Sequence, residues 1–562
     1  MTVCKRLARH GFIAFLLLPA VAIAAGQRVP DQAAIASAHP LATEAGLEIL
    51  EQGGNAFDAA VAVSAALAVV EPYSSGTGGG GFWLLHQASS DRDVFVDGRE
   101  VAPCAATKDM YLDEEGNPIP RLSLDGPLAA GIPGHPAALA HIASQYGRLP
   151  LAASLAPAIR YAAEGFPAYE RIRDGLEFKR ELIGRWPAAA EIFLDDGEVP
   201  AEGALIRQPE LAATLRVLAE KGRDGFYAGE VARRLVQGVR DAGGIWTLAD
   251  LASYRVVERE PIHADYRGVR ITTAPPPSAG GVALIEILNI LSAYELKALE
   301  GAARKHLVVE AMRRAYRDRA EFLGDPDFVD APLKRLLHPW YAAGLRNSIR
   351  TDRATPSSML PGIRPAGTQG TQTTHFSVLD GEGNRVAATL SINFWFGSGF
   401  MPEGTGVLLN NEMNDFSIKP GVPDGYQLVG ADANAIAPGK RMLSSMMPTV
   451  LESDEGIAIL GTPGGSRIIS MVLLGTLAWI DGASAEQMVA LPRYHHQYLP
   501  DQVFYETAAL SEEEQAALRA MGHELAATED EYGNMQVVTW DFENGEVEAA
   551  SDPRGVGEGL VY

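Results

Sequence analysis

The chain has 562 residues, 47% of them hydrophobic and 21% charged, which is typical of a globular protein with a large core. Length alone favours two or more domains. The formal net charge of −24 argues against nucleic acid and anionic membrane surfaces as partners.

The first 25 residues have the three parts of a secretory signal peptide. Lys5, Arg6 and Arg9 precede an apolar run over 12–25 that ends in small residues. This run is too short for a comfortable transmembrane helix, and no later run is long enough. Removal of residues 1–25 moves the net charge from −24 to −27, because three positive charges are lost. We expect an exported protein without a stable membrane anchor.

Cysteine is scarce. Cys4 lies in the signal segment, so only Cys104 remains after processing. An intramolecular disulfide and a multi-thiolate metal site are therefore excluded. A lone cysteine is more often a small buried hydrophobe than a nucleophile, and we expect that structural role for Cys104.

Several regular elements can be predicted in chain order. Asn55 and Asp58 form a capping box after a glycine stop, and the nearly all-apolar run 59–70 predicts a buried helix. The run 301–323 alternates apolar residues with Arg and Glu, which predicts a half-exposed helix. The run 471–480 suits a buried helix. Strand patterns occur at 82–86, 94–96, 269–273, 374–379, 385–392, 457–460 and 536–540.

Residues 75–81 (SGTGGGG) contain a formal GxGxxG pattern. A helix precedes this run and a strand follows it, which is the reverse of a dinucleotide-binding fingerprint, and the Lys-Ser/Thr ending of a P-loop is missing. We interpret the glycines as a tight turn that another segment approaches closely.

A loop rich in Pro, Gly and Ser spans residues 354–372 and is the clearest internal boundary. A polar-apolar alternation begins directly after it at Thr373. If the chain is cut before Thr373, that residue gains a free α-amine with a pKa of about 7.7–8.0 beside its own hydroxyl. One residue would then supply both nucleophile and general base.

Residues 381–384 (GEGN) have turn chemistry, so 373–380 and 385–393 predict a hairpin. An even-length loop pairs Thr373 with Ile392, and an odd one pairs it with Ser391 or Asn393. Each register brings a hydroxyl and a carboxamide within one rung of Thr373.

Three polar clusters follow, at 410–415 (NNEMND), 443–446 (LSSM) and 461–466 (GTPGGS). Paired glycines offer adjacent backbone N–H groups of the kind an oxyanion hole requires. His495 and His496 are adjacent and have no carboxylate at ligand spacing, so we expect structural roles for them. The chain has no GxSxG nucleophile elbow.

Together and in this order, these segments closely resemble the γ-glutamyltranspeptidase family of N-terminal nucleophile hydrolases. The resemblance runs from residues 36–39 (ASAH) to 550–554 (ASDPR), and its most specific part is the signature from Thr373-Thr374-His375 to Phe396-Gly397. It implies an α+β fold, the αββα four-layer sandwich. It also implies one precursor that cuts itself between Gln372 and Thr373 into a large subunit (26–372) and a small subunit (373–562), which remain together as an interleaved heterodimer.

The resemblance also implies the roles of the site residues. Thr373 would attack the γ-carbonyl of a γ-glutamyl compound, while Gly464 and Gly465 hold the oxyanion. A second hydroxyl falls on Ser391, where the family usually has threonine; we expect function to persist with looser positioning. The substrate α-carboxylate would be bound by Arg99, Ser444 and Ser445. The substrate α-ammonium would be bound by Asn393, Glu412 and Asp415.

Residues 420–426 (PGVPDGY) resemble the lid loop of many bacterial members, with Tyr426 covering the pocket. Because certain cephalosporin acylases lack this loop, its presence favours a glutathione-type enzyme. The expected activity is γ-glutamyl transfer and glutathione hydrolysis, with water, amino acids or peptides as acceptors and without metal or cofactor. Two alternatives remain: the same fold acting on glutaryl or cephalosporin amides, and a catalytically silent protein that binds glutamyl peptides. The periplasm is the expected location.

Overall fold

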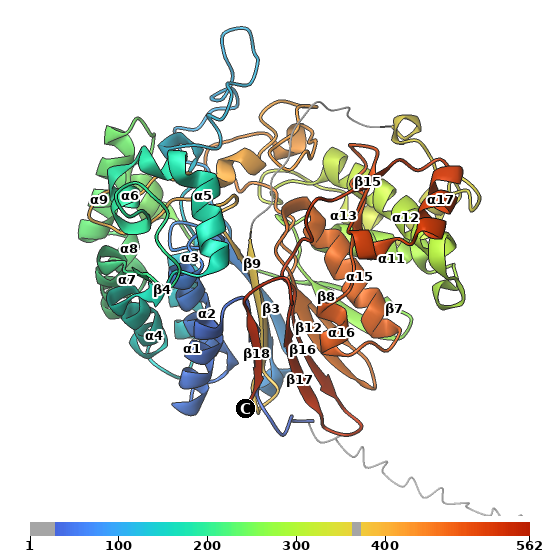
Figure 1. Ribbon diagram of the computed structural model, residues 1–562, viewed down its shortest axis with the longest axis horizontal. Coiled ribbons are helices and arrows are strands. Elements are labelled where there is room, and N and C mark those ends of the chain that lie inside the picture. The colour runs from blue at the N-terminus through green and yellow to red at the C-terminus, as the bar shows by residue number, and fades with distance from the viewer. Residues whose placement is uncertain (1–27, 362–372) are drawn as a thin grey trace, which may run out of the picture.

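The computed structural model describes residues 28–361 and 373–562, so the signal segment and Gln372 lie outside the described residues. Two antiparallel sheets form its centre (Figure 1). The larger has seven strands in the order β18 (Glu558–Val561), β1 (Ala34–Ser37), β9 (Thr374–Leu379), β10 (Arg385–Ser391), β2 (Gly80–Gln87), β3 (Arg92–Gly98) and β6 (Val257–Arg259).

The second sheet has six strands in the order β17 (Val547–Ser551), β16 (Gln536–Asp541), β12 (Gly456–Gly461), β11 (Thr449–Glu452), β8 (Val269–Thr273) and β7 (Ile262–Tyr266). The two sheets face each other, since the Ser377 hydroxyl of β9 donates to the Ile459 carbonyl of β12 at 3.1 Å. Each sheet mixes strands from before and after the 354–372 loop. The two parts of the chain therefore share both sheets.

Helices cover the outer face of each sheet (Figure 1). Those on the side of the seven-stranded sheet are α1 (Pro40–Glu51), α2 (Ala56–Val70), α3 (His135–Gln145), α4 (Leu151–Glu164), α5 (Glu170–Gly184), α6 (Pro187–Phe193), α7 (Pro209–Lys221), α8 (Arg223–Tyr227), α9 (Gly229–Asp241) and α10 (Leu248–Ser253). Those on the other side are α11 (Gly280–Leu291), α12 (Gly301–Phe322), α13 (Leu333–Leu336), α14 (Pro339–Arg346), α15 (Ile468–Ile480), α16 (Ala485–Val489) and α17 (Glu512–Ala520). The layer order confirms the predicted αββα sandwich.

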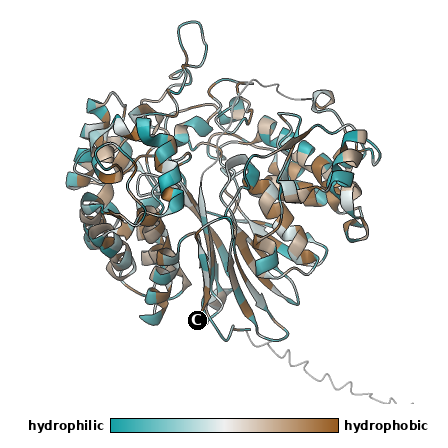
Figure 2. Cartoon of the chain, in the orientation of Figure 1, coloured by the Kyte–Doolittle hydropathy of each residue, from teal (hydrophilic) through white to brown (hydrophobic). Residues whose placement is uncertain are grey.

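The expected strands and the buried helices are all present, with ends shifted by a few residues. Asn55 and Asp58 make the predicted capping box at the start of α2, and every residue of α2 is buried. Apolar residues follow the strands and the helix faces turned to them, while polar residues gather on the outer helices (Figure 2). Within the described residues, no helix combines the length and apolar character needed to cross a bilayer.

The expectation that the helix at 301–323 is half exposed is wrong. This helix forms α12, but fourteen of its residues, from His306 to Ala320, are buried. Three of the buried charged side chains pair within the helix: the Glu310 carboxylate contacts Arg313 at 3.2 Å and Arg314 at 2.8 Å. An alternating pattern of charge therefore indicated exposure where internal ion pairs allow burial.

Candidate active site

The hairpin of β9 and β10 fixes the surroundings of Thr373. Its register pairs Thr374 with Leu390, so Thr373, one residue earlier, continues the ladder opposite Ser391. This selects one of the alternatives that the sequence left open. The Asp380 carboxylate shapes the turn by accepting the backbone N–H groups of Glu382 and Asn384, each at 2.9 Å. Thr373 is 4% exposed and lines a cavity together with Ser391.

The glycine run confirms the predicted close approach. A side chain on Gly78 would come within 2.1 Å of the Leu408 carbonyl oxygen, and one on Gly79 within 2.2 Å of the Ser391 carbonyl oxygen. Only glycine lets these backbones meet. The run thus positions the end of β10, which carries Ser391, and the segment before the acidic cluster.

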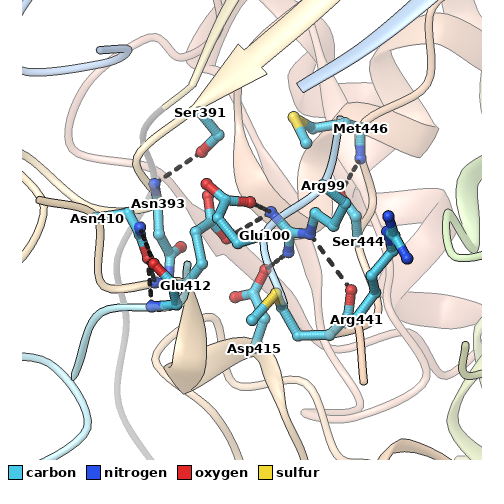
Figure 3. A network of polar contacts seen from close by, with 12 residues as sticks. Arg99, Glu100, Ser391, Asn393, Asn410, Glu412, Asp415, Arg441, Ser444 and Met446 are labelled. Atoms are coloured by element: carbon cyan, nitrogen blue, oxygen red, sulfur yellow. Dashed lines mark hydrogen bonds and ion pairs between the residues drawn. The ribbon is translucent and has the colours of Figure 1, made fainter. Parts of the chain in front are cut away.

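Ser391 and Asn393 form one polar unit beside the nucleophile position. The Ser391 hydroxyl oxygen accepts the Asn393 backbone N–H at 2.7 Å (Figure 3). Asn393 has a left-handed backbone, with φ of 75°. Its side-chain amide donates to the Asn411 carbonyl at 3.0 Å, and its side-chain oxygen accepts the Tyr426 hydroxyl at 2.5 Å. These bonds fix both side chains at the cavity wall.

The two glycines proposed for an oxyanion hole precede α15. Gly464 and Gly465 have φ values of 142° and 55°, which favour glycine. A side chain on Gly465 would also lie 2.2 Å from the Tyr426 ring. Gly465 lines the same cavity as Thr373, whereas Gly464 lies one residue outside that lining.

Arg99 is the centre of the charge arrangement and is 1% exposed. Its guanidinium lies 2.6 Å from the Glu412 carboxylate, 2.5 Å from Asp415 and 3.5 Å from Glu100 (Figure 3). Burial alone would lower the pKa of Arg99, but the three carboxylates raise it above its ordinary value. Burial and the Glu412 charge raise the pKa of both Glu100 and Asp415. The cluster carries more acidic groups than positive ones.

Several of these acidic oxygens have no partner. Oε1 of Glu100, Oε1 of Glu412 and Oδ1 of Asp415 are buried without a hydrogen bond to any described residue. Unpaired acceptors of this kind are costly in a folded protein. Since Glu412 and Asp415 line the cavity, their oxygens are suited to a cationic donor that enters it.

Ser444 and Ser445 are neighbours in the chain and line the cavity together with Arg99 and Asn393. Ser444 is held by backbone bonds to Pro277 and Ala279, each at 2.8 Å. The Ser445 hydroxyl oxygen accepts a hydrogen bond from Arg319 at 3.4 Å. Both serines line the cavity with Thr373.

Two residues of the predicted lid, Asp424 and Tyr426, line this cavity. The Tyr426 ring stacks on Phe394 with centroids 4.7 Å apart, and the Asp424 carboxylate accepts the backbone N–H groups of Tyr426 and Leu428. Burial raises the pKa of Asp424 to about 6. About 20 Å³ of free space remains beneath, close to the room that one water requires. A larger ligand therefore has to displace the lid or the charged side chains.

Among the described residues, every predicted site residue except Gly464 lines this cavity. Sequence reasoning missed Glu100, Asn410, Arg319 and Asp424. Asn410 orders the acidic loop, because its side-chain oxygen accepts the Glu412 N–H at 3.0 Å and its amide donates to Gly78. Asn410 and Asp424 stand inside segments already noted, and Glu100 directly follows Arg99 in the sequence, whereas Arg319 has no local signal.

Two further expectations can be compared with the structure. His495 and His496 are buried and bonded to Ser470 and Asp501, which agrees with structural roles. The expected burial of Cys104 is wrong: this cysteine is exposed. Its backbone N–H donates to the Asp250 carboxylate at 2.8 Å.

One group of residues has the composition of a metal site. Potential ligand atoms of His306, Glu310 and His523 lie within 4.8 Å of one another. The two imidazoles already share a hydrogen bond of 2.7 Å, and Glu310 is paired with two arginines. The charge of Glu310 is thus balanced by protein groups.

A separate cavity of about 500 Å³ beside α3 shares no lining residue with the Thr373 site.

Comparison with known proteins agrees with this geometry. Residues 42–562 match the family described as Gamma-glutamyltranspeptidase. A glutathione hydrolase proenzyme from Pseudomonas sp. (strain A14) is 44% identical over 502 residues, covering 88% of this chain and 86% of the relative. The proenzyme of the same name from Escherichia coli (strain K12) is 41% identical over 530 residues, covering 93% and 91%.

Solved structures give the same result. A cephalosporin acylase from Bacillus halodurans superposes with a TM-score of 0.83 at 30% identity, covering 95% of this chain and 96% of the other. A γ-glutamyltranspeptidase from Helicobacter pylori superposes with a TM-score of 0.57 at 42% identity, covering 58% and 94%. The chain therefore belongs to the γ-glutamyltranspeptidase family.

Proposed function

We propose that this protein is a self-processing γ-glutamyltransferase and glutathione hydrolase. The observation that carries the proposal is one cavity lined by Thr373, Arg99 and the acidic pair Glu412 and Asp415. It combines a hydroxyl nucleophile with binding groups for an ammonium and a carboxylate. Relatives named glutathione hydrolase proenzyme support both the substrate and the processing.

Processing would separate Gln372 from Thr373. The Thr373 hydroxyl attacks the Gln372 carbonyl carbon, the peptide C–N bond breaks, and the Thr373 amine takes up a proton. Water then hydrolyses the resulting ester and leaves a large subunit (26–372) and a small subunit (373–562). Because strands from both sides of the cut share each sheet, we expect the two subunits to stay together as a heterodimer.

In the mature site, the Thr373 α-amine would take the proton of its own hydroxyl as that oxygen attacks the γ-carbonyl. The N–H groups of Gly464 and Gly465 would stabilise the oxyanion. The Ser391 hydroxyl, held by the Asn393 N–H, would orient the nucleophile. The amine of the cleaved substrate takes that proton and departs. The γ-glutamyl group, held as an ester on Thr373, is then transferred to water or to the amine of an amino acid or peptide.

Charge explains the choice of acyl group. The unpaired oxygens of Glu412 and Asp415 favour the α-ammonium, with Asn393 at their side. Arg99, Ser444 and Ser445 would receive the α-carboxylate, since a guanidinium matches a carboxylate with two parallel bonds. The surplus of carboxylates around Arg99 makes a ligand with a positive charge favourable.

A second candidate is an acylase for glutaryl or cephalosporin amides, which the superposition on the Bacillus halodurans acylase favours. Those acyl groups lack the α-ammonium, so they would leave the oxygens of Glu412 and Asp415 unpaired. The lid with Tyr426 likewise favours the γ-glutamyl substrate. A silent binding protein would need neither Thr373 nor cleavage.

The test compares γ-glutamyl and glutaryl p-nitroanilides with the processed protein. We expect hydrolysis of the γ-glutamyl compound with a kcat/KM at least about a hundredfold higher, the effect of a lost charge-assisted contact. Preference for the glutaryl compound would establish the acylase instead, and binding without turnover would indicate the silent protein. The signal segment supports export, and we propose the periplasm as the location.

A further inference from the structure

Arg319 is a second buried arginine at the catalytic cavity. It lies near the end of α12, is 6% exposed, and lines the cavity together with Thr373 and Arg99. Arg319 belongs to the helical layer that covers the six-stranded sheet, whereas Thr373 precedes a strand of the seven-stranded sheet. The sequence around Thr373 therefore gives no sign of Arg319. Nothing in the mechanism described so far requires it.

The guanidinium of Arg319 is poorly paired. Its one side-chain hydrogen bond to the described residues runs from Nη2 to the Ser445 hydroxyl at 3.4 Å, which is longer than the usual range. Its Nε is buried without a partner in the described part of the chain. No described carboxylate lies within 4.0 Å of its nitrogens. Burial lowers the pKa of Arg319, and Asp424 is the main opposing charge.

Arg99 differs sharply from Arg319. Both of its terminal nitrogens contact carboxylates, and its Nε donates to the Met442 carbonyl at 3.3 Å. Arg99 thus shares its single positive charge among three acidic groups, so a second positive group beside it would strengthen the attraction for a carboxylate. A buried, unpaired guanidinium is costly, and an incoming carboxylate would relieve that cost.

We propose that Arg319 is a specificity residue that, together with Ser445, adds a second guanidinium to the site where Arg99 receives the α-carboxylate of the substrate. This inference rests on the proposed γ-glutamyl activity and adds a residue to it. The free Nε–H and the Nη2 of Arg319 are the donors directed to the carboxylate. Binding adds one negative charge next to the least compensated positive charge in the cavity.

The test uses processed enzyme, confirmed as two bands on a denaturing gel, and two p-nitroanilides: the γ-glutamyl compound and its analogue with an α-carboxamide. We expect Arg319→Gln to raise KM for the γ-glutamyl compound about tenfold or more, the loss of a charged hydrogen bond. kcat should stay within about threefold, and KM for the carboxamide should not change.

Lys305→Gln serves as the control. It removes a positive charge from the same helix at its pair with Glu514, outside the cavity lining. It should not alter the preference for carboxylate over carboxamide. An Arg319→Gln loss that is equal on both substrates, or the same change of preference in Lys305→Gln, overturns the inference.

If Arg319→Gln is recovered only as uncut chain, Arg319→Lys gives the answer. It keeps the charge without the planar fork, so KM should rise severalfold for the γ-glutamyl compound alone; an equal rise on both compounds contradicts the proposal. Failure of the proposed function is distinguishable: the parent enzyme would then be processed yet fail to cleave the γ-glutamyl compound.

Discussion

Two buried clusters of charge involve α12, and they differ in how fully their charges are paired. Around Glu310, the carboxylate is shared by Arg313 and Arg314 and also accepts the Thr355 N–H at 3.0 Å. None of these three charged side chains has an unpartnered buried atom among the described residues. At the cavity, by contrast, three carboxylate oxygens and the Nε of Arg319 remain unpaired.

This difference separates a structural role from a binding role. The Glu310 cluster is complete. Through Arg313 it joins α12 to Ser357 in the 354–372 loop and to Asp501. The cavity cluster is incomplete and has unmatched groups of both signs. A ligand with an ammonium and a carboxylate would complete it, which is the chemistry of a γ-glutamyl group.

The largest effect is expected from Thr373→Ala, which removes the one group that no other residue replaces. This variant should remain a single uncut chain without measurable γ-glutamyl hydrolysis, because both steps use the same hydroxyl. A denaturing gel and a p-nitroanilide assay check this. A cut and active Thr373→Ala protein would disprove the assignment of the nucleophile.

Glu310→Gln should unfold more easily while retaining its activity. It leaves Arg313 and Arg314 buried without their shared carboxylate, which costs about 3–5 kcal/mol of unfolding free energy. The melting temperature should fall, with kcat/KM of the folded fraction within about twofold of the parent. A loss of activity with an unchanged melting temperature would show that the Glu310 cluster has a binding role instead of a structural one.

Glu412→Gln is the matched change in the cavity and should do the reverse. We expect kcat/KM for the γ-glutamyl compound to fall about a hundredfold, because the ammonium loses a buried charged partner. The melting temperature should stay level or rise, since repulsion with Glu100 and Asp415 is relieved. A large loss of stability with activity retained would contradict the distinction between the two clusters.

The lid carboxyl gives a smaller, pH-dependent effect. The pKa of Asp424 is raised from 3.8 to about 6 in the folded protein, mainly by burial. The folded state thus holds this proton more tightly than the unfolded chain, so the contribution of Asp424 to stability grows as pH falls from 6 toward 3.8. The gain is at most about 3 kcal/mol.

Melting curves over pH 4–7 for the parent and Asp424→Asn check this. Asparagine can still accept the N–H groups of Tyr426 and Leu428, so the lid geometry is kept. The parent should become more stable relative to the variant as pH falls through 6. Parallel curves would show that Asp424 titrates normally.

Ser391 should give the smallest effect on catalysis. Ser391→Ala removes the hydroxyl opposite Thr373, and we expect kcat to fall about tenfold, as for the loss of one hydrogen bond. Ser391→Thr keeps the hydroxyl and adds only a methyl group, so its kcat should stay within about threefold of the parent value. An alanine variant with the parent kcat would exclude a positioning role.

Much of this site could be predicted because its parts stand in short motifs. Alternating strands and turn residues gave the hairpin, and the resemblance gave Arg99, Ser391 and the acidic and serine pairs. The register could not be settled, because it depends on the Asp380 side chain holding a five-residue turn.

The charged face of α12 misled for a different reason. Its arginines are separated by three or four residues from Glu310, a spacing that also occurs on exposed helices. Arg319 was missed because its role arises only when α12 packs over a cavity formed by residues 54 or more positions away in the chain. Sequence pattern records pairs within one element better than charges brought together from different elements.

The central claim is tested most directly by the N-terminal sequence of the small subunit. Purified protein should give two bands on a denaturing gel of about 37 and 20 kDa, in proportion to their residue counts in a 59.9 kDa chain. The smaller band should begin Thr373-Thr374-His375-Phe376. A single full-length band from an otherwise folded protein, or a smaller band that begins at another residue, would contradict the account.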